Sequence, residues 1–582
     1  MNCNRILIIS GFFLLFLYLI YNIIGIQTSS GFFNYALIIF GSCFLLFGIA
    51  QEKILNFFGK INELFESKTY HILFIALIVS LLIRLFLLPE RWINPDEGAH
   101  LYDAKFILDG KIPFVDYESR MPVYAYILAA WAKIFGCNYL YMRLLPLFAN
   151  IGICIFIFLI GKKLFNSNRI ALLASIIYLF LPLSIIWSVV VKTELIETFF
   201  VCAGMYFLFS YIKSEEENNS IVFISGIFYA LAYYVRKSAI IMLIASLLII
   251  IYFYRNDIYR IIKTYGLVLL GYSFVVLIIL LYFGNFLGFS MVWNSTLNPL
   301  DTIIDPIIKI TEISTETTTS TTSNILHQPY YQTILSWKWT LILNSFIFFG
   351  IFLFISLVIY NIIYNKNNDM FETDKSSLIF LCIWIVSIFV FYLYYTIGYK
   401  FYIQYFGEVL PVLALTLAYA IYFIINEKKS NKIINNYIGL ISIVMIALYL
   451  LSICFFSVSS DCVWSPDTVD EVSHYIESHS DEYDVVMSGA MIWTFESNTK
   501  PFINITHPLM FLYTISEKNK NEIEYQMEHN KPEFIILDGY TEKTYLRQMP
   551  EIYDVINESY ILTYEVNGSS HPVKIYEIDT NE

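Results

Sequence analysis

Charged residues are scarce in this sequence. They make up 14% of its 582 residues, whereas 58% are apolar and the mean hydropathy is +0.63. Because about a quarter of the residues in an ordinary soluble domain are charged, a water-soluble protein of this size is excluded. The composition predicts a polytopic α-helical membrane protein.

The sequence also lacks the marks of several other protein classes. Its eight cysteines have neither metal-ligand nor disulfide spacing, and no internal repeat is visible. The first apolar run has no small-residue cleavage site and is followed by a second run. It is therefore predicted to be a membrane anchor rather than a removed signal peptide.

Charge is unevenly divided along the chain. Residues 458–582 hold 23 acidic and 7 basic residues, while the first 457 hold 25 acidic and 29 basic. We place a domain boundary near Val458 and expect an acidic soluble domain beyond it, which argues against nucleic acid as a partner. The domain is predicted to be α/β, because polar helix-like stretches separate four β-rich runs. These runs lie at 483–488, 501–506, 533–539 and 573–578.

About thirteen apolar runs have the length that a bilayer requires. They lie near 6–26, 31–50, 70–88, 143–161, 170–187, 195–212, 220–235, 239–254, 264–283, 335–361, 377–396, 404–425 and 436–456. Residues 67–457 are predicted to form the main transmembrane domain. Residues 1–66 add two further helices and an amphipathic helix in the interface.

Basic residues in short loops predict the orientation. Arg5 and the lysines before the third run indicate a cytoplasmic N-terminus, so residues 89–142 would form a first outer loop. Residues 121–136 within it are apolar enough to cross the membrane. However, crossing would send most later basic loops outside, so we predict that this stretch lies in the interface.

The same topology places the C-terminal domain on the extracytoplasmic side, most simply of the plasma membrane. It also makes residues 284–334 a long outer loop, which contains the polar low-complexity tract 311–323. Such a tract does not pack a core, so the loop is predicted to be a flexible connector. A mobile flap over an external site is the alternative.

Several basic residues are predicted on the outer side near the membrane, where the positive-inside tendency disfavours them. They are Arg120, Lys192, Arg236, Lys237 and Lys400. Each alone could be a lipid-headgroup contact. Together with nearby acids, they predict a site that holds a membrane-borne phosphate beside a carboxylate.

Acids begin two helices predicted on the same side. Asp96 and Glu97 follow a proline, and Glu194 begins a later helix that also carries Glu197. The helix dipole alone favours acids in a first turn, so a purely structural role is the alternative. His100 lies one turn after Asp96, and the two could ligate a divalent metal, although two ligands do not make a complete site.

These residue types suit sugar transfer from a polyprenyl-phosphate donor, whose tail stays in the bilayer while its phosphate lies at headgroup level. The reaction needs a base for the attacking hydroxyl or amine and cations for the departing phosphate. Asp96 fits the role of the base. Arg120, Arg236 and Lys237 fit the role of phosphate ligands.

Residues 95–143 read PDEGAHLYDAKFILDGKIPFVDYESRMPVYAYILAAWAKIFGCNYLYMR. This segment resembles the first outer loop of GT-C class membrane glycosyltransferases, in the group of the dolichyl-phosphate-mannose protein mannosyltransferases and the lipid A aminoarabinose transferase. Weaker similarities follow at 189–200 and 400–421, so the resemblance covers most of residues 70–456.

The resemblance implies a GT-C catalytic domain with Asp96 as the catalytic carboxylate, Glu97 as its partner and Glu194 as a second external acid. Arg120 stands where relatives carry a basic residue that contacts the donor phosphate. The expected partners are a polyprenyl-phosphate sugar donor, membrane lipids, and an acceptor that could be a glycan, a protein or a lipid.

The late motif departs from the family pattern, because Gln404 replaces a common arginine and Lys400 would take over its phosphate role. Two other functions remain open. An oligosaccharyltransferase of the same broad fold would carry a WWDYG run, which this sequence lacks. A transporter or flippase for a lipid-linked sugar would show paired half-repeats and charges buried within spans. Apart from Arg84, the predicted spans carry few charges away from their ends.

Overall fold

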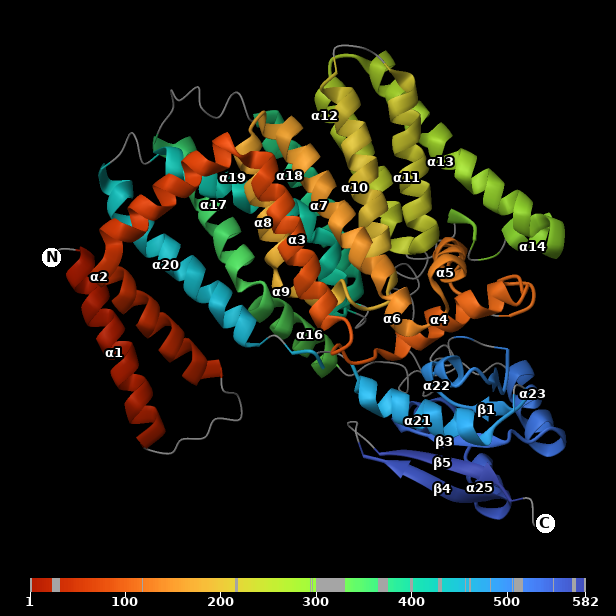
Figure 1. The fold of residues 1–582 in the computed structure, drawn as a ribbon. Helices are drawn as coiled ribbons and strands as arrows, with labels where there is room; N and C mark the ends of the chain where they lie inside the picture. Colours follow the sequence, from red (N-terminus) through yellow and green to blue (C-terminus); the bar gives the residue numbers. More distant parts are fainter. Residues whose placement is uncertain are drawn as a thin grey trace, which may run out of the picture.

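The computed structural model is mainly helical, with one small sheet near the C-terminus (Figure 1). It describes residues 3–23, 32–117, 119–214, 218–293, 295, 297–299, 330–364, 375–397, 401–427, 432–455, 457–459, 462–481, 483–504, 506, 517–547, 549–567 and 572–579. Lys400 and most of the predicted outer loop 284–334 lie outside these residues. The connector and flap hypotheses for that loop therefore stay predictions.

The bundle is built from apolar helices. They are α1 (Cys3–Ile23), α2 (Phe32–Ser67), α3 (Thr69–Leu87), α7 (Leu144–Phe165), α8 (Asn168–Phe180), α9 (Pro182–Trp187), α10 (Thr193–Ile212), α11 (Asn219–Val235), η1 (Lys237–Ile240), α12 (Ile241–Tyr254), α13 (Ile258–Leu287), α14 (Phe289–Trp293), α16 (Tyr330–Leu343), α17 (Ser345–Tyr364), α18 (Lys375–Ile397), η3 (Ile403–Val409), α19 (Leu410–Glu427) and α20 (Lys432–Cys454).

Within the described residues, seven helices are long and apolar enough to cross a membrane. There are eight if the bent pair Thr333–Leu343 and Ser345–Leu353 forms one span, and six further apolar helices are shorter. The chain is therefore an integral membrane protein, as predicted.

The predicted spans all fall on these helices, but some of them are interrupted. The run 170–187 divides at Leu181, which is extended because it precedes Pro182. The run 335–361 bends by 70° between α16 and α17. At the N-terminus α1 packs against α2, and α2 continues through a kink at Ala50 into the stretch predicted to lie in the interface.

Three helices lie between the bundle and the C-terminal domain: α4 (Pro95–Leu108), α5 (Pro122–Phe135) and α6 (Tyr139–Met142) (Figure 1). They come from the predicted first outer loop. α5 packs on α4 and on α11, and its 14 residues are too few to cross hydrocarbon.

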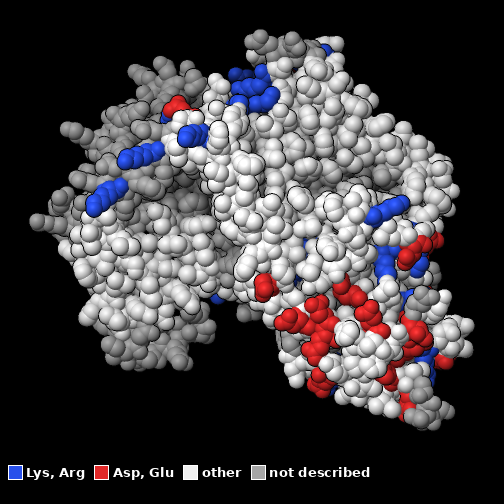
Figure 2. Space-filling model, viewed as in Figure 1, with Lys and Arg blue, Asp and Glu red and all other residues white. Residues whose placement is uncertain are grey.

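The C-terminal domain contains α21 (Pro466–His479), β1 (Val485–Met487), α22 (Ile492–Glu496), β2 (Lys500–Pro501), α23 (Glu517–His529), β3 (Phe534–Leu537), α24 (Gly539–Thr541), η5 (Glu542–Leu546), α25 (Glu551–Ser559), β4 (Tyr560–Val566) and β5 (Val573–Ile578). Its sheet has the order β2-β1-β3-β5-β4, with parallel pairs among β2, β1 and β3 and antiparallel pairs elsewhere. The predicted α/β class is confirmed. Acidic side chains gather on this domain in Figure 2.

Strand β4 is missing from the predicted strands. Among the described strands it pairs with β5 alone, at the edge of the sheet, with an irregularity between Leu562 and Tyr564. Most of its residues are not buried. An edge strand buries little, so its sequence carries only a weak apolar signal.

Gly226 of α11 and Gly271 of α13 let these helices approach closely. A Cβ at Gly226 would lie 2.0 Å from the Val268 carbonyl oxygen, and one at Gly271 would lie 2.0 Å from the Phe223 carbonyl oxygen. Small residues commonly permit such contacts in membranes. We expect Gly226→Ala to separate the helices and to cost about 1–3 kcal/mol, measured as a lower thermal unfolding temperature in detergent.

Gly266→Ala, also on α13, is the matched control, because a Cβ there would meet nothing within 4 Å outside its own helix. An equal loss of thermal stability in both variants would contradict the expected role of close packing at Gly226.

Candidate active site

Asp96 lies at the start of α4 and faces two basic side chains. The helix is capped by Asn94, whose side chain accepts a hydrogen bond from Asp96 N at 3.1 Å. Lys192 Nζ lies 2.7 Å from Asp96 Oδ2, and an Arg120 guanidinium nitrogen lies 3.5 Å from Asp96 Oδ1. Three separate segments therefore meet at one carboxylate.

The three side chains of this cluster differ in their access to solvent. The exposed fraction is 40% for Arg120 and 23% for Asp96, but only 7% for Lys192. Arg120 can therefore contact an incoming anion without first leaving a buried position. Lys192 is held against Asp96 by its buried surroundings.

Glu97, the neighbour of Asp96, is fully buried and forms a different kind of contact. Arg143 donates to both carboxylate oxygens, with Nε and one terminal nitrogen each at 2.8 Å, and Val191 N donates to Oε1 at 3.0 Å. Arg143 also donates to the Leu88 and Arg91 carbonyl oxygens. This bidentate pair joins α4 to the start of α7 and to the segment that leads into α10.

The segment 188–192, which carries Lys192, is fixed from two sides. Glu97 accepts from Val191 N, while Arg84 of α3 donates to Ser188 Oγ at 2.8 Å. Arg84 also donates to the Leu179 carbonyl oxygen at 2.9 Å. Arg84, the charged residue within the third predicted span, therefore supports the loop that brings Lys192 to Asp96.

A second cluster surrounds Arg236, at the end of α11. Arg236 Nη1 lies 3.1 Å from Glu194 Oε1 and 2.7 Å from Glu408 Oε1, and Arg236 Nε lies 3.9 Å from Glu197 Oε2. The guanidinium also lies over the Tyr405 ring, 4.0 Å from its centroid. Three carboxylates thus surround one guanidinium. The structure joins Glu194 and Arg236 to each other rather than to Asp96.

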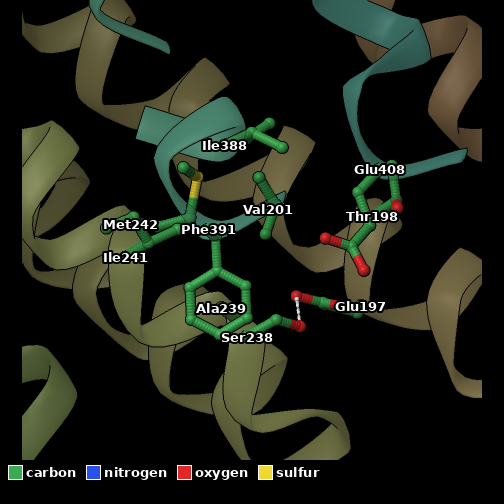
Figure 3. A pocket seen from close by; sticks show the side chains of 10 residues that line it. All are labelled: Glu197, Thr198, Val201, Ser238, Ala239, Ile241, Met242, Ile388, Phe391 and Glu408. Atoms are coloured by element: carbon green, nitrogen blue, oxygen red, sulfur yellow. Dashed lines mark hydrogen bonds between the residues drawn. The ribbon is translucent and has the colours of Figure 1, made fainter. Parts of the chain in front are cut away.

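A small pocket lies beside this cluster (Figure 3). Its polar side is formed by Glu197 and Thr198 of α10, Ser238 of η1 and Glu408 of η3, and Ser238 donates to Glu197 at 2.8 Å. The opposite wall is apolar and includes Phe391 of α18.

Two residues of this arrangement were not predicted to have a role. Arg143 ends the segment that carries the family resemblance, so its place in that segment was a signal. Glu408 is an acid inside a late apolar run, which is costly in a membrane and was a second signal. Lys237 is half-buried at the start of η1, whereas Lys400 lies outside the described residues.

His100 is buried on α4, with its ring edge-to-face against Tyr124 at a centroid distance of 4.9 Å. Burial, aided by the nearby Arg120 and Lys192, lowers the pKa of His100 to about 3, while Asp96 acts in the opposite direction. Among the described residues, no group of three or more His, Cys, Asp or Glu side chains could hold a metal. A metal at Asp96 and His100 would therefore need further ligands from elsewhere.

Known proteins provide an independent comparison. Residues 119–283 match the family described as dolichyl-phosphate-mannose-protein mannosyltransferase. ArnT from Cupriavidus metallidurans in the apo state has a TM-score of 0.51 at 10% identity, covering 88% of this chain and 98% of that one. The same protein bound to undecaprenyl phosphate gives 0.51 at 11% identity, covering 88% and 99%. The chain has the GT-C membrane fold.

The GT-C fold and the matched segment confirm the resemblance predicted from the sequence. The matched segment contains Arg120, Arg143, Lys192, Glu194 and Arg236. The apo oligosaccharyltransferase of Archaeoglobus fulgidus also aligns, with a TM-score of 0.48 at 12% identity over 82% of this chain and 70% of that one. No curated protein sequence matches the chain.

The Glu97–Arg143 pair should be sensitive to the loss of one partner. Arg143→Met leaves a buried carboxylate without its counter-ion, and we expect a loss of about 3–5 kcal/mol in unfolding free energy. The double variant combines Arg143→Met with Glu97→Gln. The second change removes the buried negative charge but keeps an oxygen that can accept from Val191 N. Thermal unfolding in detergent should show the double variant to be more stable than Arg143→Met alone. Additive losses would contradict the pairing.

The lowered pKa of His100 predicts a loss of stability in acid. Well above pH 6.5 the imidazole is neutral in both the folded and the unfolded chain, so it contributes little pH dependence there. As the pH falls from 6.5 towards 3, the unfolded chain binds a proton that the folded chain does not. His100→Phe keeps an aromatic ring, and its thermal stability should fall less between pH 7 and pH 5 than that of the wild type. An identical fall would contradict the prediction.

Proposed function

We propose that the protein transfers a sugar from a polyprenyl-phosphate donor to an acceptor hydroxyl or amine, with Asp96 as the general base. The observation that carries this proposal is the partly exposed Asp96 carboxylate beside Lys192 and Arg120. A base and cations for a departing phosphate are the groups that such a transfer needs.

In the proposed reaction, the acceptor oxygen or nitrogen attacks the anomeric carbon as the bond from that carbon to the phosphate oxygen breaks. Asp96 takes the acceptor proton, and the polyprenyl phosphate leaves with the bonding electron pair. Arg120 is exposed and planar, so it can bind the phosphate through two parallel hydrogen bonds. Lys192 offsets the negative charge that develops on the departing phosphate.

The remaining site residues have proposed roles of a different kind. Glu97 would position Asp96 through its bond to Arg143 rather than touch the substrates. Glu194 would be the second acid, with Arg236 as its counter-ion. Arg236, Lys237 and Lys400 stay proposed phosphate ligands. Arg236 would have to exchange one of its carboxylate contacts for the phosphate.

The donor class is supported by the ArnT structure bound to undecaprenyl phosphate. We further propose that the C-terminal domain and Asp96 are extracytoplasmic, most simply at the plasma membrane, with the N-terminus in the cytoplasm. Basic side chains gather at the end of the bundle away from the C-terminal domain in Figure 2, which supports this orientation.

A flippase for a lipid-linked sugar is the second candidate. It is favoured by the buried charged residues Arg84, Glu197 and Glu408 and by Arg236, which pairs with Glu408. Intramembrane ionisable residues often mark a transport path. The two functions differ in their product, since only the transferase releases polyprenyl phosphate.

The Asp96→Asn variant tests the transferase. We expect wild type, incubated with radiolabelled polyprenyl-phosphate sugars and a crude membrane extract as acceptor, to release polyprenyl phosphate. Asp96→Asn should be slower by about 100-fold or more, because the base is lost. Asp109→Asn, at the exposed C-terminal end of the same helix, is the matched control and should turn over as wild type does. If none of the three proteins releases polyprenyl phosphate, while wild type moves labelled lipid across vesicle membranes, the flippase is the better function.

A further inference from the structure

The C-terminal domain contacts α4 within two residues of Asp96. Gly98 lies against the start of α22, so closely that a Cβ at this position would come within 2.3 Å of Ile492 N and 2.8 Å of Ile492 Cα. No side chain fits there without a backbone shift. The close approach explains why this position carries glycine although it lies inside a helix.

The chain is also fixed just before Asp96. Ile93 forms an antiparallel bridge with Trp464, with Ile93 N donating to the Trp464 carbonyl oxygen at 2.8 Å and Val463 N donating to the Ile93 carbonyl oxygen at 3.1 Å. Asp96 therefore lies between two backbone contacts with the C-terminal domain, one at Ile93 and one at Gly98.

Further along α4, hydrogen bonds extend the contact. Tyr102 Oη donates to the Thr499 carbonyl oxygen at 3.0 Å, and Thr506 Oγ1 donates to Asp103 Oδ1 at 2.7 Å. Asp103 is buried. A buried carboxylate needs such partners, so the two surfaces are matched in their polar groups as well as in shape.

The apolar packing is continuous across the boundary. One buried cluster combines Ile93, Leu101 and Tyr102 with Trp464 and Ile492, whereas a second cluster lies wholly within the C-terminal domain. We call the first cluster the interdomain core. Ordinary interfaces between mobile domains are more polar than such a core, so α4 and the C-terminal domain should move as one unit.

We propose that the C-terminal domain is a positioning part of the active site: through Ile492 and Trp464 it fixes α4, and so keeps Asp96 against Lys192 and Arg120. This role rests on the proposed transferase function. It differs from an independent acceptor-binding module, which would need no continuous core with the helix that carries the base. Gly98, Ile492 and Trp464 act through Asp96 and do not touch the substrate.

Full-length Gly98→Ala tests this role, with Gly266→Ala as the matched control. The new methyl group must push α22 away from α4. We expect amide hydrogen exchange in the peptide Pro95–Leu108 to become faster and kcat for polyprenyl phosphate release to fall by about 10–100-fold. The KM for the donor should change little, because Arg120 is still present. Gly266→Ala should leave both readouts unchanged.

A milder variant is used if Gly98→Ala does not fold. Tyr102→Phe with Thr506→Val removes two hydrogen bonds across the interdomain core but leaves the backbone contact. We expect smaller changes in the same direction: a lower kcat, an unchanged KM for the donor and faster amide hydrogen exchange in α4.

Two outcomes would overturn the positioning role. One is faster exchange in α4 with an unchanged kcat, and the other is unchanged exchange in α4 in both the Gly98→Ala and the double variant. Failure of the proposed function is distinct, because wild type itself would then release no polyprenyl phosphate. In that case the exchange data still decide whether the domain fixes α4.

Discussion

The buried Glu97–Arg143 pair is the contact on which the candidate site depends. Moving two charges out of water is costly, and only a bidentate geometry with further hydrogen bonds offsets that cost. Arg143 supplies the bidentate geometry, and Val191 N and the carbonyl oxygens of Leu88 and Arg91 supply the further bonds. One ion pair thereby fixes both the helix that bears Asp96 and the loop that bears Lys192.

The two charged clusters differ in composition and in exposure to solvent. Asp96 is one carboxylate beside two cations, and Arg120 there is open to solvent. Arg236 is one guanidinium beside three carboxylates, within buried surroundings. An anion approaching from solvent therefore reaches an exposed cation at the first cluster, whereas the cation of the second is already in contact with carboxyl groups. This difference favours Arg120 and Lys192 over Arg236 as the first contacts of a donor phosphate.

The sequence predicts the parts of the molecule that depend on local pattern. Composition and apolar runs predict the membrane helices. The segment 95–143 carries the GT-C resemblance and identifies Asp96 and Arg120 as candidate site residues. The pairing of Glu97 with Arg143, and of Arg236 with Glu408, depends on how distant helices pack, which no local pattern encodes. The same is true of the contact between Gly98 and Ile492. Strand β4 was missed for another reason, since an edge strand buries too little to leave a clear alternation.

The contact between α4 and the C-terminal domain also bears on biosynthesis. Tyr102 and Thr499 are 397 residues apart, so a ribosome adding 5–20 residues per second needs roughly 20–80 s to make the second after the first. During that time the newly made α4 has no C-terminal domain to pack against, and Leu101 and Tyr102 lack the partners that later complete the interdomain core. A chain that stops before residue 458 would insert its helices and still lack the surface that covers α4.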